Sequence, residues 1–127
     1  MRFLIDTHVA LWSLEGDERL SPGAKELLGD ISTELYLSIV SVWEVAIKIS
    51  IGKLNFEGGV KEFSRRIRNA GVGVLGLDDK YLECLETLPF LHRDPFDRLL
   101  IATVLTEGMT FVTADENIHR YNIKWMR

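Results

Sequence analysis

Four acidic side chains have the chemistry and the positions from which a cation-dependent catalytic site can be built. They lie far apart in the chain, each close to an expected strand end or helix start: Asp6, Glu44, Asp97 and Asp115. Carboxylates held close together raise one another's pKa, so the cluster needs a counter-charge. Ligand sets made only of oxygen, without Cys or His, favour Mg²⁺ or Mn²⁺ over a structural zinc.

A pair of such ions suits the hydrolysis of phosphodiester bonds. One ion lowers the pKa of an attacking water while the other stabilises the leaving oxygen, with the ions about 4 Å apart. The spacing of the acids along the chain is not diagnostic by itself. The hypothesis therefore requires a fold that brings the four acids together.

Each acid also has a local explanation at a helix start. Ser41 and Glu44 have the spacing of a capping box, and Glu44 stands four residues before Lys48, which favours a helical ion pair. Asp97 would lie at the positive end of a helix dipole. Asp115 is placed to begin a helix after the strand that contains Thr113. Taken one at a time, these explanations need no function.

Strand-like and helix-like segments alternate along the chain. Strands are expected within residues 2–6, 34–40, 71–77, 110–115 and 122–126. Helices are expected within residues 7–16, 20–30, 41–52, 60–71, 78–88 and 94–108. The segment 41–52 is apolar nearly all round, which predicts burial between the sheet and another layer. This alternation predicts an α/β fold with crossover connections, a parallel sheet and helices on both faces.

The sheet provides a reason for the acids to meet. Sites in open parallel sheets form beyond the carboxyl ends of the strands. Asp6 and Asp115 close two of the expected strands, Glu44 lies one turn into the helix after another, and Asp97 lies in the first turn of the central apolar helix. All four acids are therefore expected at one edge of the sheet.

Composition narrows the class of protein. The 127 residues are enough for one compact domain, and 46% hydrophobic with 27% charged residues is typical of a globular protein. The net charge of −4 argues against a broad basic surface for nucleic acid, although it leaves room for a local site. The N-terminus, interrupted by Asp6 and His8, does not read as a signal peptide, and no segment has the length of a membrane span. The single Cys84 suits a reducing cytoplasm.

Four blocks of sequence resemble one family over essentially the whole chain and in the expected order. The blocks "LIDTHVALW", "LSIVSVWEVAIKISIGKL", "HRDPFDRLLIA" and "FVTADENI" are similar to those of PIN-domain ribonucleases, in particular the toxin members of VapBC-type toxin–antitoxin pairs. The resemblance implies a three-layer α/β/α sandwich around a parallel sheet, in a single domain over residues 1–127. It also implies a Mg²⁺- or Mn²⁺-dependent endoribonuclease that cuts a structured RNA such as tRNA or rRNA, and a cognate antitoxin that blocks its site.

The family's acidic quartet carries over to Asp6, Glu44, Asp97 and Asp115, and its hydroxyl residue near the last acid to Thr113. As hypotheses, Asp6 and Asp97 bind the principal metal and Glu44 completes its shell or orients the attacking water. Asp115 favours a second ion, and Thr113 holds water or a carboxylate. Cleavage of this kind leaves a 5′-phosphate and a 3′-hydroxyl.

Several residues outside the acidic quartet are expected to cap a helix or to contact RNA. Asp94, before Pro95, is expected to be a helix N-cap. His8 and His92 lack zinc-ligand spacing and are interpreted as RNA contacts. A basic rim for phosphates is expected from six residues: Lys48, Arg65, Arg66, Arg68, Arg93 and Arg98. For Arg65, Arg66 and Arg68 the alternative is a solvated helix face.

The apolar aromatic residues are expected in the core or at an interface. Trp12 and Trp43 occupy apolar positions of their helices. Trp12, with Leu11 and Leu14, is a candidate surface for the antitoxin or for a second copy in a homodimer.

Two other functions fit parts of the pattern. A phospho-receiver or small phosphatase also carries acids at strand ends, but it needs paired acids near the first strand and a late lysine, and neither is present. A non-catalytic PIN-like scaffold that binds RNA or protein would use the four acids only as helix caps. Under that alternative, Glu44→Gln or Asp97→Asn would leave RNA cleavage and growth arrest unchanged.

Overall fold

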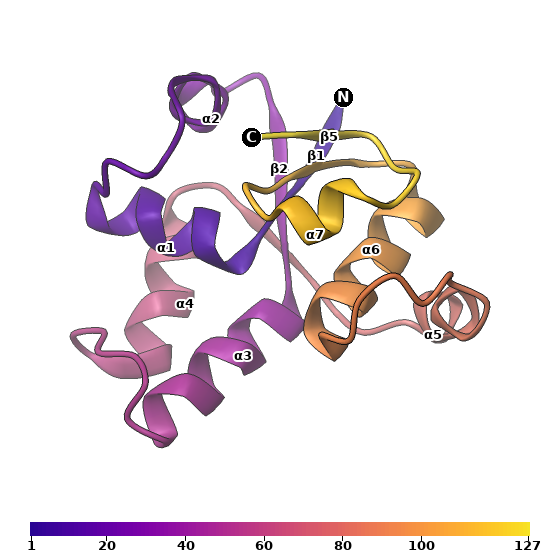
Figure 1. Ribbon diagram of the computed structural model, residues 1–127. Coiled ribbons are helices and arrows are strands. Elements are labelled where there is room, and N and C mark those ends of the chain that lie inside the picture. The colour runs from indigo at the N-terminus through magenta and orange to yellow at the C-terminus, as the bar shows by residue number, and fades with distance from the viewer.

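Short apolar segments of the chain form one five-stranded parallel sheet (Figure 1). The computed structural model describes all residues 1–127. The strands are β1 (Arg2–Ile5), β2 (Glu34–Ser38), β3 (Gly73–Leu75), β4 (Thr110–Val112) and β5 (Trp125–Met126). Their order in the sheet is β3-β2-β1-β4-β5, and every neighbouring pair is parallel. The predicted parallel sheet is confirmed, with the last segment as a short edge strand.

Helices fill the connections between the strands. They are α1 (Thr7–Glu15), α2 (Pro22–Gly29), α3 (Ile39–Ser50), α4 (Gly59–Asn69), α5 (Asp79–Glu86), α6 (Pro95–Glu107) and α7 (Glu116–His119). Asp94 is the N-cap of α6 as predicted, because its side chain accepts hydrogen bonds from the Phe96 and Asp97 amides. Gly108 then ends α6 with a φ of 66°, a left-handed conformation that suits glycine. None of the helices has both the length and the apolar composition that a membrane crossing requires.

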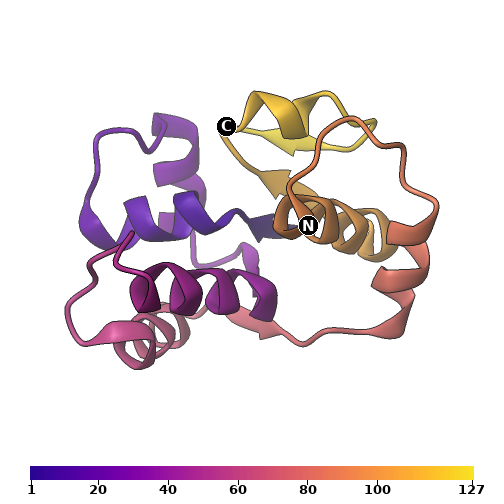
Figure 2. The same cartoon turned by 60° about the horizontal axis from the view of Figure 1, so that its bottom comes forward.

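Alternating side chains of the strands define two apolar layers. Phe3 and Ile5 of β1 belong to one core cluster with residues of α1, α2, α3 and α4, whereas Leu4 belongs to a second cluster with α5 and α6. This alternation follows from the two-residue period of a strand. The turned view in Figure 2 shows the indigo to pink helices on one side and the orange helices on the other. The chain is thus the expected three-layer α/β/α sandwich.

Helix α3 differs from its prediction in two ways. It begins at Ile39, and Ser38 caps it by accepting a hydrogen bond from the Val40 amide at 3.0 Å, so the predicted capping box of Ser41 and Glu44 is wrong. The helix is also not buried all round, since Trp43 is 57% exposed. The physical reason is position: α3 leaves the sheet at its carboxyl edge, where no further layer covers its outer side.

The strand order places a crevice at the centre of the carboxyl edge. The chain winds outwards from β1 to β3 with its helices on one face, then crosses over through α5 and α6 to β4, which pairs with the other side of β1. The order therefore reverses between β1 and β4, which is the topological switch point where ligands bind in open α/β sheets. Helix α6 runs back towards the start of β4, so its N-terminus lies at this same edge.

Candidate metal centre and active site

Asp6 lies directly after β1, at the switch point. Its amide donates to the Val112 carbonyl at 3.0 Å, which ties it to the end of β4. Its side chain caps α1 by accepting the Thr7 amide at 2.7 Å, and its other oxygen accepts the Thr113 hydroxyl at 2.7 Å. Burial, with a smaller contribution from Glu44, raises the pKa of Asp6 above its usual value, although these donors and His8 oppose the shift.

Glu44 reaches the same edge from the second turn of α3. The residue is only 7% exposed. One carboxylate oxygen accepts a hydrogen bond from the Thr7 hydroxyl at 2.9 Å, and the other pairs with Lys48 Nζ at 2.7 Å. Thr7 Oγ1 also lies 2.8 Å from Ser41 Oγ. The predicted ion pair with Lys48 is therefore present, and Thr7 links the helices that carry Asp6 and Glu44.

Asp97 is a second acid whose ionisation is disfavoured. Its side chain is 14% exposed, and its Oδ2 lies 3.3 Å from His92 Nε2. Burial raises the pKa of Asp97 to about 8, and the negative charges of Asp6, Asp94, Asp115 and Glu44 add to the shift. Asp94, and not Asp97, provides the cap of this helix, so capping does not explain the position of Asp97.

Asp115 and Thr113 complete the edge beyond β4. Asp115 caps the short helix α7 by accepting the Asn117 amide at 2.9 Å, and its own amide donates to Thr113 Oγ1 at 3.1 Å. Thr113 is fully buried and donates its hydroxyl proton to Asp6. Thr113 thus connects the acids that follow β1 and β4.

The five predicted site residues therefore lie around the switch point at the carboxyl edge of the sheet, and their donor chemistry fits a divalent cation. The set consists of hard oxygen donors, which Mg²⁺ and Mn²⁺ prefer. The mutual repulsion felt at Asp97 shows that negative charge is in excess there. No three side chains of the ligand types converge closely enough to form a ready-made ion site. Each carboxylate instead meets its own local hydrogen-bond partner, as repulsion between like charges favours.

Most of the predicted basic rim is engaged elsewhere. Arg98 is 8% exposed, and its guanidinium donates to the Pro89 carbonyl at 2.9 Å and the Tyr121 hydroxyl at 3.1 Å. The prediction that Arg98 contacts phosphate is therefore wrong, because packing against the loop before α6 buries it. Lys48 is paired with Glu44.

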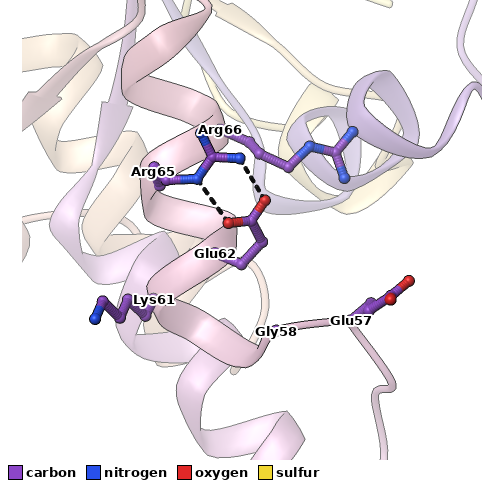
Figure 3. Close-up of a pocket in the computed structure, with 6 residues that line it drawn as sticks. All are labelled: Glu57, Gly58, Lys61, Glu62, Arg65 and Arg66. Atoms are coloured by element: carbon purple, nitrogen blue, oxygen red, sulfur yellow. Dashed lines mark hydrogen bonds and ion pairs between the residues drawn. The ribbon is translucent and has the colours of Figure 1, made fainter.

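Two of the three arginines of α4, Arg65 and Arg66, line a separate surface pocket of about 410 Å³ (Figure 3). Arg65 makes two hydrogen bonds to Glu62, at 2.7 and 2.6 Å. Arg66 donates to the Leu14 carbonyl at 2.7 Å and lies over the Phe56 ring. None of the four acids lines this pocket. Arg65 and Arg66 therefore bind structural partners and do not contribute to the acidic site.

A groove with basic and aromatic walls adjoins the acids. Two neighbouring hollows of about 290 and 330 Å³ share His8, Trp12 and Arg19. The first also contains Asp6 and Asp115, and the second extends to Lys48 and Lys53. The Arg19 guanidinium lies 5.1 Å from the centre of the Trp12 ring, and the His8 ring 6.0 Å from it. We call these two hollows together the α1 groove.

The sequence alone did not predict the residues that hold the acids in place. Thr7 and Ser41 support Glu44, and Tyr121 contacts His92 at 2.9 Å. Thr7 has one local signal, its position next to Asp6. Tyr121 has none, because it comes from the loop after α7 and meets His92 only through the tertiary fold.

Fold and crevice together define the class of protein. The PIN domain family matches residues 3–124, and this chain belongs to that family. The family resemblance drawn from the four sequence blocks is thereby confirmed.

Individual relatives carry more specific names. The chain is 27% identical to ribonuclease VapC22 of Mycobacterium tuberculosis, and the match covers 93% of this chain and 92% of that protein. Among solved structures, it is similar to VapBC2 from Rickettsia felis bound to a promoter DNA fragment, with a TM-score of 0.75, 12% identity and coverage of 99% and 98% of the two chains. FitAcB from Neisseria gonorrhoeae has a TM-score of 0.68 and 16% identity, with coverage of 98% and 96%. The structures support the α/β/α fold.

Proposed function

We propose that this chain is a Mg²⁺- or Mn²⁺-dependent endoribonuclease and the toxin of a VapBC-type toxin–antitoxin pair. The observation that carries the proposal is the placement of Asp6, Glu44, Asp97 and Asp115 around the switch point, where burial and, after it, the charges of the neighbouring acids raise the pKa of Asp97 to about 8. A carboxylate cluster of this kind is unfavourable unless a cation neutralises it. Membership of the PIN family and the similarity to ribonuclease VapC22 support the reaction.

The side chains divide the work of binding and orientation. Asp6 and Asp97 are the proposed ligands of the principal cation, and Asp115 favours a second. Glu44, held by Thr7 and Lys48, completes the shell or orients water, and Thr113 keeps one Asp6 oxygen in place. Bound divalent cations supply an acidified water and charge stabilisation at the leaving oxygen. Water adds to phosphorus, the bond to the 3′-oxygen breaks, and the products carry a 5′-phosphate and a 3′-hydroxyl.

Incubation of the chain with total tRNA and rRNA in Mn²⁺ tests the proposal. We expect cleavage that EDTA abolishes, with products that a 5′-phosphate-dependent exonuclease degrades. Glu44→Gln, which retains the shape of the side chain, should lower the rate by about a hundredfold or more, because orienting groups in such sites contribute on this scale. Products with 2′,3′-cyclic phosphate would exclude water as the nucleophile. If Glu44→Gln cleaved RNA at the wild-type rate, the alternative of a non-catalytic scaffold would be favoured.

We propose the α1 groove as the path of the RNA away from the acids. Trp12 offers a ring for stacking of a base, and Lys53 a charge for phosphate, at the end of the groove away from Asp115. An antitoxin that fills the same groove would block the site. In the Glu44→Gln background, Lys53→Ala should weaken tRNA binding several-fold and leave Mn²⁺ affinity unchanged. Lys61→Ala on α4, outside the groove, is the matched control.

We also propose that the chain forms a homodimer through the outer side of α3. Trp43 packs edge-to-face on Phe96 with ring centres 5.0 Å apart, and Ile39, one turn earlier, is also exposed. Exposed apolar side chains that adjoin one another mark interaction surfaces. Trp43→Ser should convert a dimer into a monomer in sedimentation experiments, whereas Leu105→Ser, at an exposed position near the other end of α6, should not. A wild-type chain that sediments as a monomer at tens of micromolar would contradict this proposal.

The remaining assignments concern the setting of the protein. We propose one domain over residues 1–127 and a reducing, cytoplasmic location, which the free Cys84 suits. Structured RNA, tRNA or rRNA, is the proposed substrate.

A further inference from the structure

A chain of hydrogen bonds runs from the buried Arg98 to the carboxylate of Asp97. Arg98 donates to the Tyr121 hydroxyl at 3.1 Å. The Tyr121 oxygen lies 2.9 Å from His92 Nδ1, and His92 Nε2 lies 3.3 Å from Asp97 Oδ2. The rings of His92 and Tyr121 also pack edge-to-face with centres 5.4 Å apart. The loop before α6 and the first turn of α6, which adjoin in the sequence, thus meet the distant loop after α7 at one proposed metal ligand.

The two groups at the ends of this series of hydrogen bonds, Arg98 and Asp97, determine which atom donates in each bond. A guanidinium only donates, so the Tyr121 oxygen accepts from Arg98. A carboxylate that binds a cation is ionised and only accepts, so the hydrogen of the neutral imidazole lies on Nε2 and points to Asp97. Nδ1 is then left as an acceptor, and the Tyr121 hydroxyl donates to it. Only the Nε2–H tautomer of His92 gives every donor in this series an acceptor.

Arg98, at the buried end of this series of hydrogen bonds, is held in place by further contacts. Arg98 also donates to the carbonyls of Leu88 and Pro89, at 3.3 and 2.9 Å, and its guanidinium lies 4.7 Å from the centre of the Phe90 ring. Tyr121 is 4% exposed and belongs to the core cluster of α5 and α6. The tyrosine hydroxyl therefore has little freedom to move, and His92 inherits a fixed orientation from it.

We infer that His92, oriented by Tyr121 and Arg98, is a positioning residue that holds Asp97 Oδ2 and leaves Oδ1, which makes no hydrogen bond, free for the cation. This inference rests on the proposed function, because it needs Asp97 to be a ligand. Hydrogen-bond partners of metal ligands typically contribute about tenfold to a hundredfold in metal affinity or activity. The arrangement explains why a tyrosine 24 positions beyond Asp97 in the chain contributes to the site.

Matched variants separate positioning from general stability. Tyr121→Phe removes the hydroxyl and keeps the ring, so His92 loses the group that selects its tautomer. Tyr81→Phe is the control, because Tyr81 is buried in the same core cluster and donates to Glu107 at 2.8 Å, at the C-terminal end of α6. His92→Leu removes the donor to Asp97, and His92→Gln supplies an amide N–H of similar reach.

Calorimetric Mn²⁺ titration without RNA is the first measurement. We expect Tyr121→Phe and His92→Leu to bind Mn²⁺ about tenfold more weakly than wild type, Tyr81→Phe to bind it like wild type, and His92→Gln to recover most of the affinity. Equal affinities for Tyr121→Phe and Tyr81→Phe, or wild-type affinity in His92→Leu, would overturn the inference. A wild type that binds no Mn²⁺ would overturn it together with the proposed function.

The ¹⁵N shifts of the His92 ring, measured in the Mg²⁺-loaded chain, are the second measurement. We expect the Nε2–H tautomer in wild type and a mixture in Tyr121→Phe. This result is independent of RNA cleavage. A chain with the expected tautomer and Mn²⁺ affinities that cuts no RNA would uphold the positioning role and overturn the nuclease. A chain that cuts RNA while His92 carries its hydrogen on Nδ1 would overturn the positioning role alone.

Discussion

Asp97→Asn is expected to reduce Mn²⁺-dependent RNA cleavage by at least about a hundredfold and to weaken Mn²⁺ binding by a similar factor. The amide keeps the size of the side chain and one oxygen, but it carries no charge and is a poor ligand for a hard cation. The helix start should survive, because Asp94 and not Asp97 caps α6. Calorimetric Mn²⁺ titration and initial cleavage rates on the same RNA measure the two effects.

Asp94→Asn is the matched control for that variant. It removes a negative charge three residues away, and asparagine is as good an N-cap as aspartate, so the hydrogen bonds to Phe96 and Asp97 can persist. We expect it to retain Mn²⁺ affinity and cleavage within a few-fold. If both variants bind Mn²⁺ like wild type, Asp97 is only a helix-start acid and the proposed nuclease lacks its metal ligand.

The second large effect concerns stability. The pKa of Asp97 is raised to about 8 in the folded chain by burial and by neighbouring acids, against about 3.9 for an unfolded aspartate. Between these two values the folded state binds more protons than the unfolded state, so the free energy of unfolding falls as the pH rises from about 4 to 8. Without metal, Asp97→Asn removes this penalty. Its Tm should exceed that of wild type by at least about 5 °C more at pH 8.5 than at pH 4.5.

Thermal scans in EDTA at the two pH values measure this difference. Asp79→Asn, an exposed acid in the first turn of α5, controls for the loss of one charge at a helix start. Saturating Mn²⁺ at pH 8.5 should raise the Tm of wild type by several degrees more than that of Asp97→Asn, because a ligand at a hundred times its Kd adds about 2.7 kcal/mol to the folded state that binds it. A constant Tm difference across the pH range would mean that Asp97 ionises as freely as an exposed carboxylate. In that case the charge cluster would not be the basis of the site.

Together these results would show that the acidic site lowers the free energy of unfolding of the metal-free protein. Burying several carboxylates at the switch point weakens the metal-free fold, and the same burial strengthens their interaction with a cation. We therefore favour a bound cation over helix capping as the role of the acids that follow β1 and β4. The capping roles of Asp6 and Asp115 are real, but they account for one oxygen of each carboxylate.

Local patterns in the sequence predicted most of the helices and strands and selected the candidate acids. The apolar run before Asp6 predicted β1, and the Asp94–Pro95 pair predicted the start of α6, because these features depend on neighbouring residues. Alternating elements predicted the parallel sheet, and a parallel sheet places the ends of its strands at one edge. That geometric rule allowed acids far apart in the chain to be grouped before any contact was known.

Tertiary packing decided what each side chain does at that edge. Arg98 has the charge of a phosphate ligand, yet it is buried under the loop before α6 and supports Tyr121. Trp43 is a large apolar side chain of the kind usually found in a core. It is nevertheless exposed, because no layer covers the outer side of α3. The partnership of His92 and Tyr121 depends on two loops that meet only in the folded chain. Sequence spacing determines helix and strand because those interactions are local, whereas burial and the direction of a hydrogen bond depend on residues that only the complete fold brings into contact.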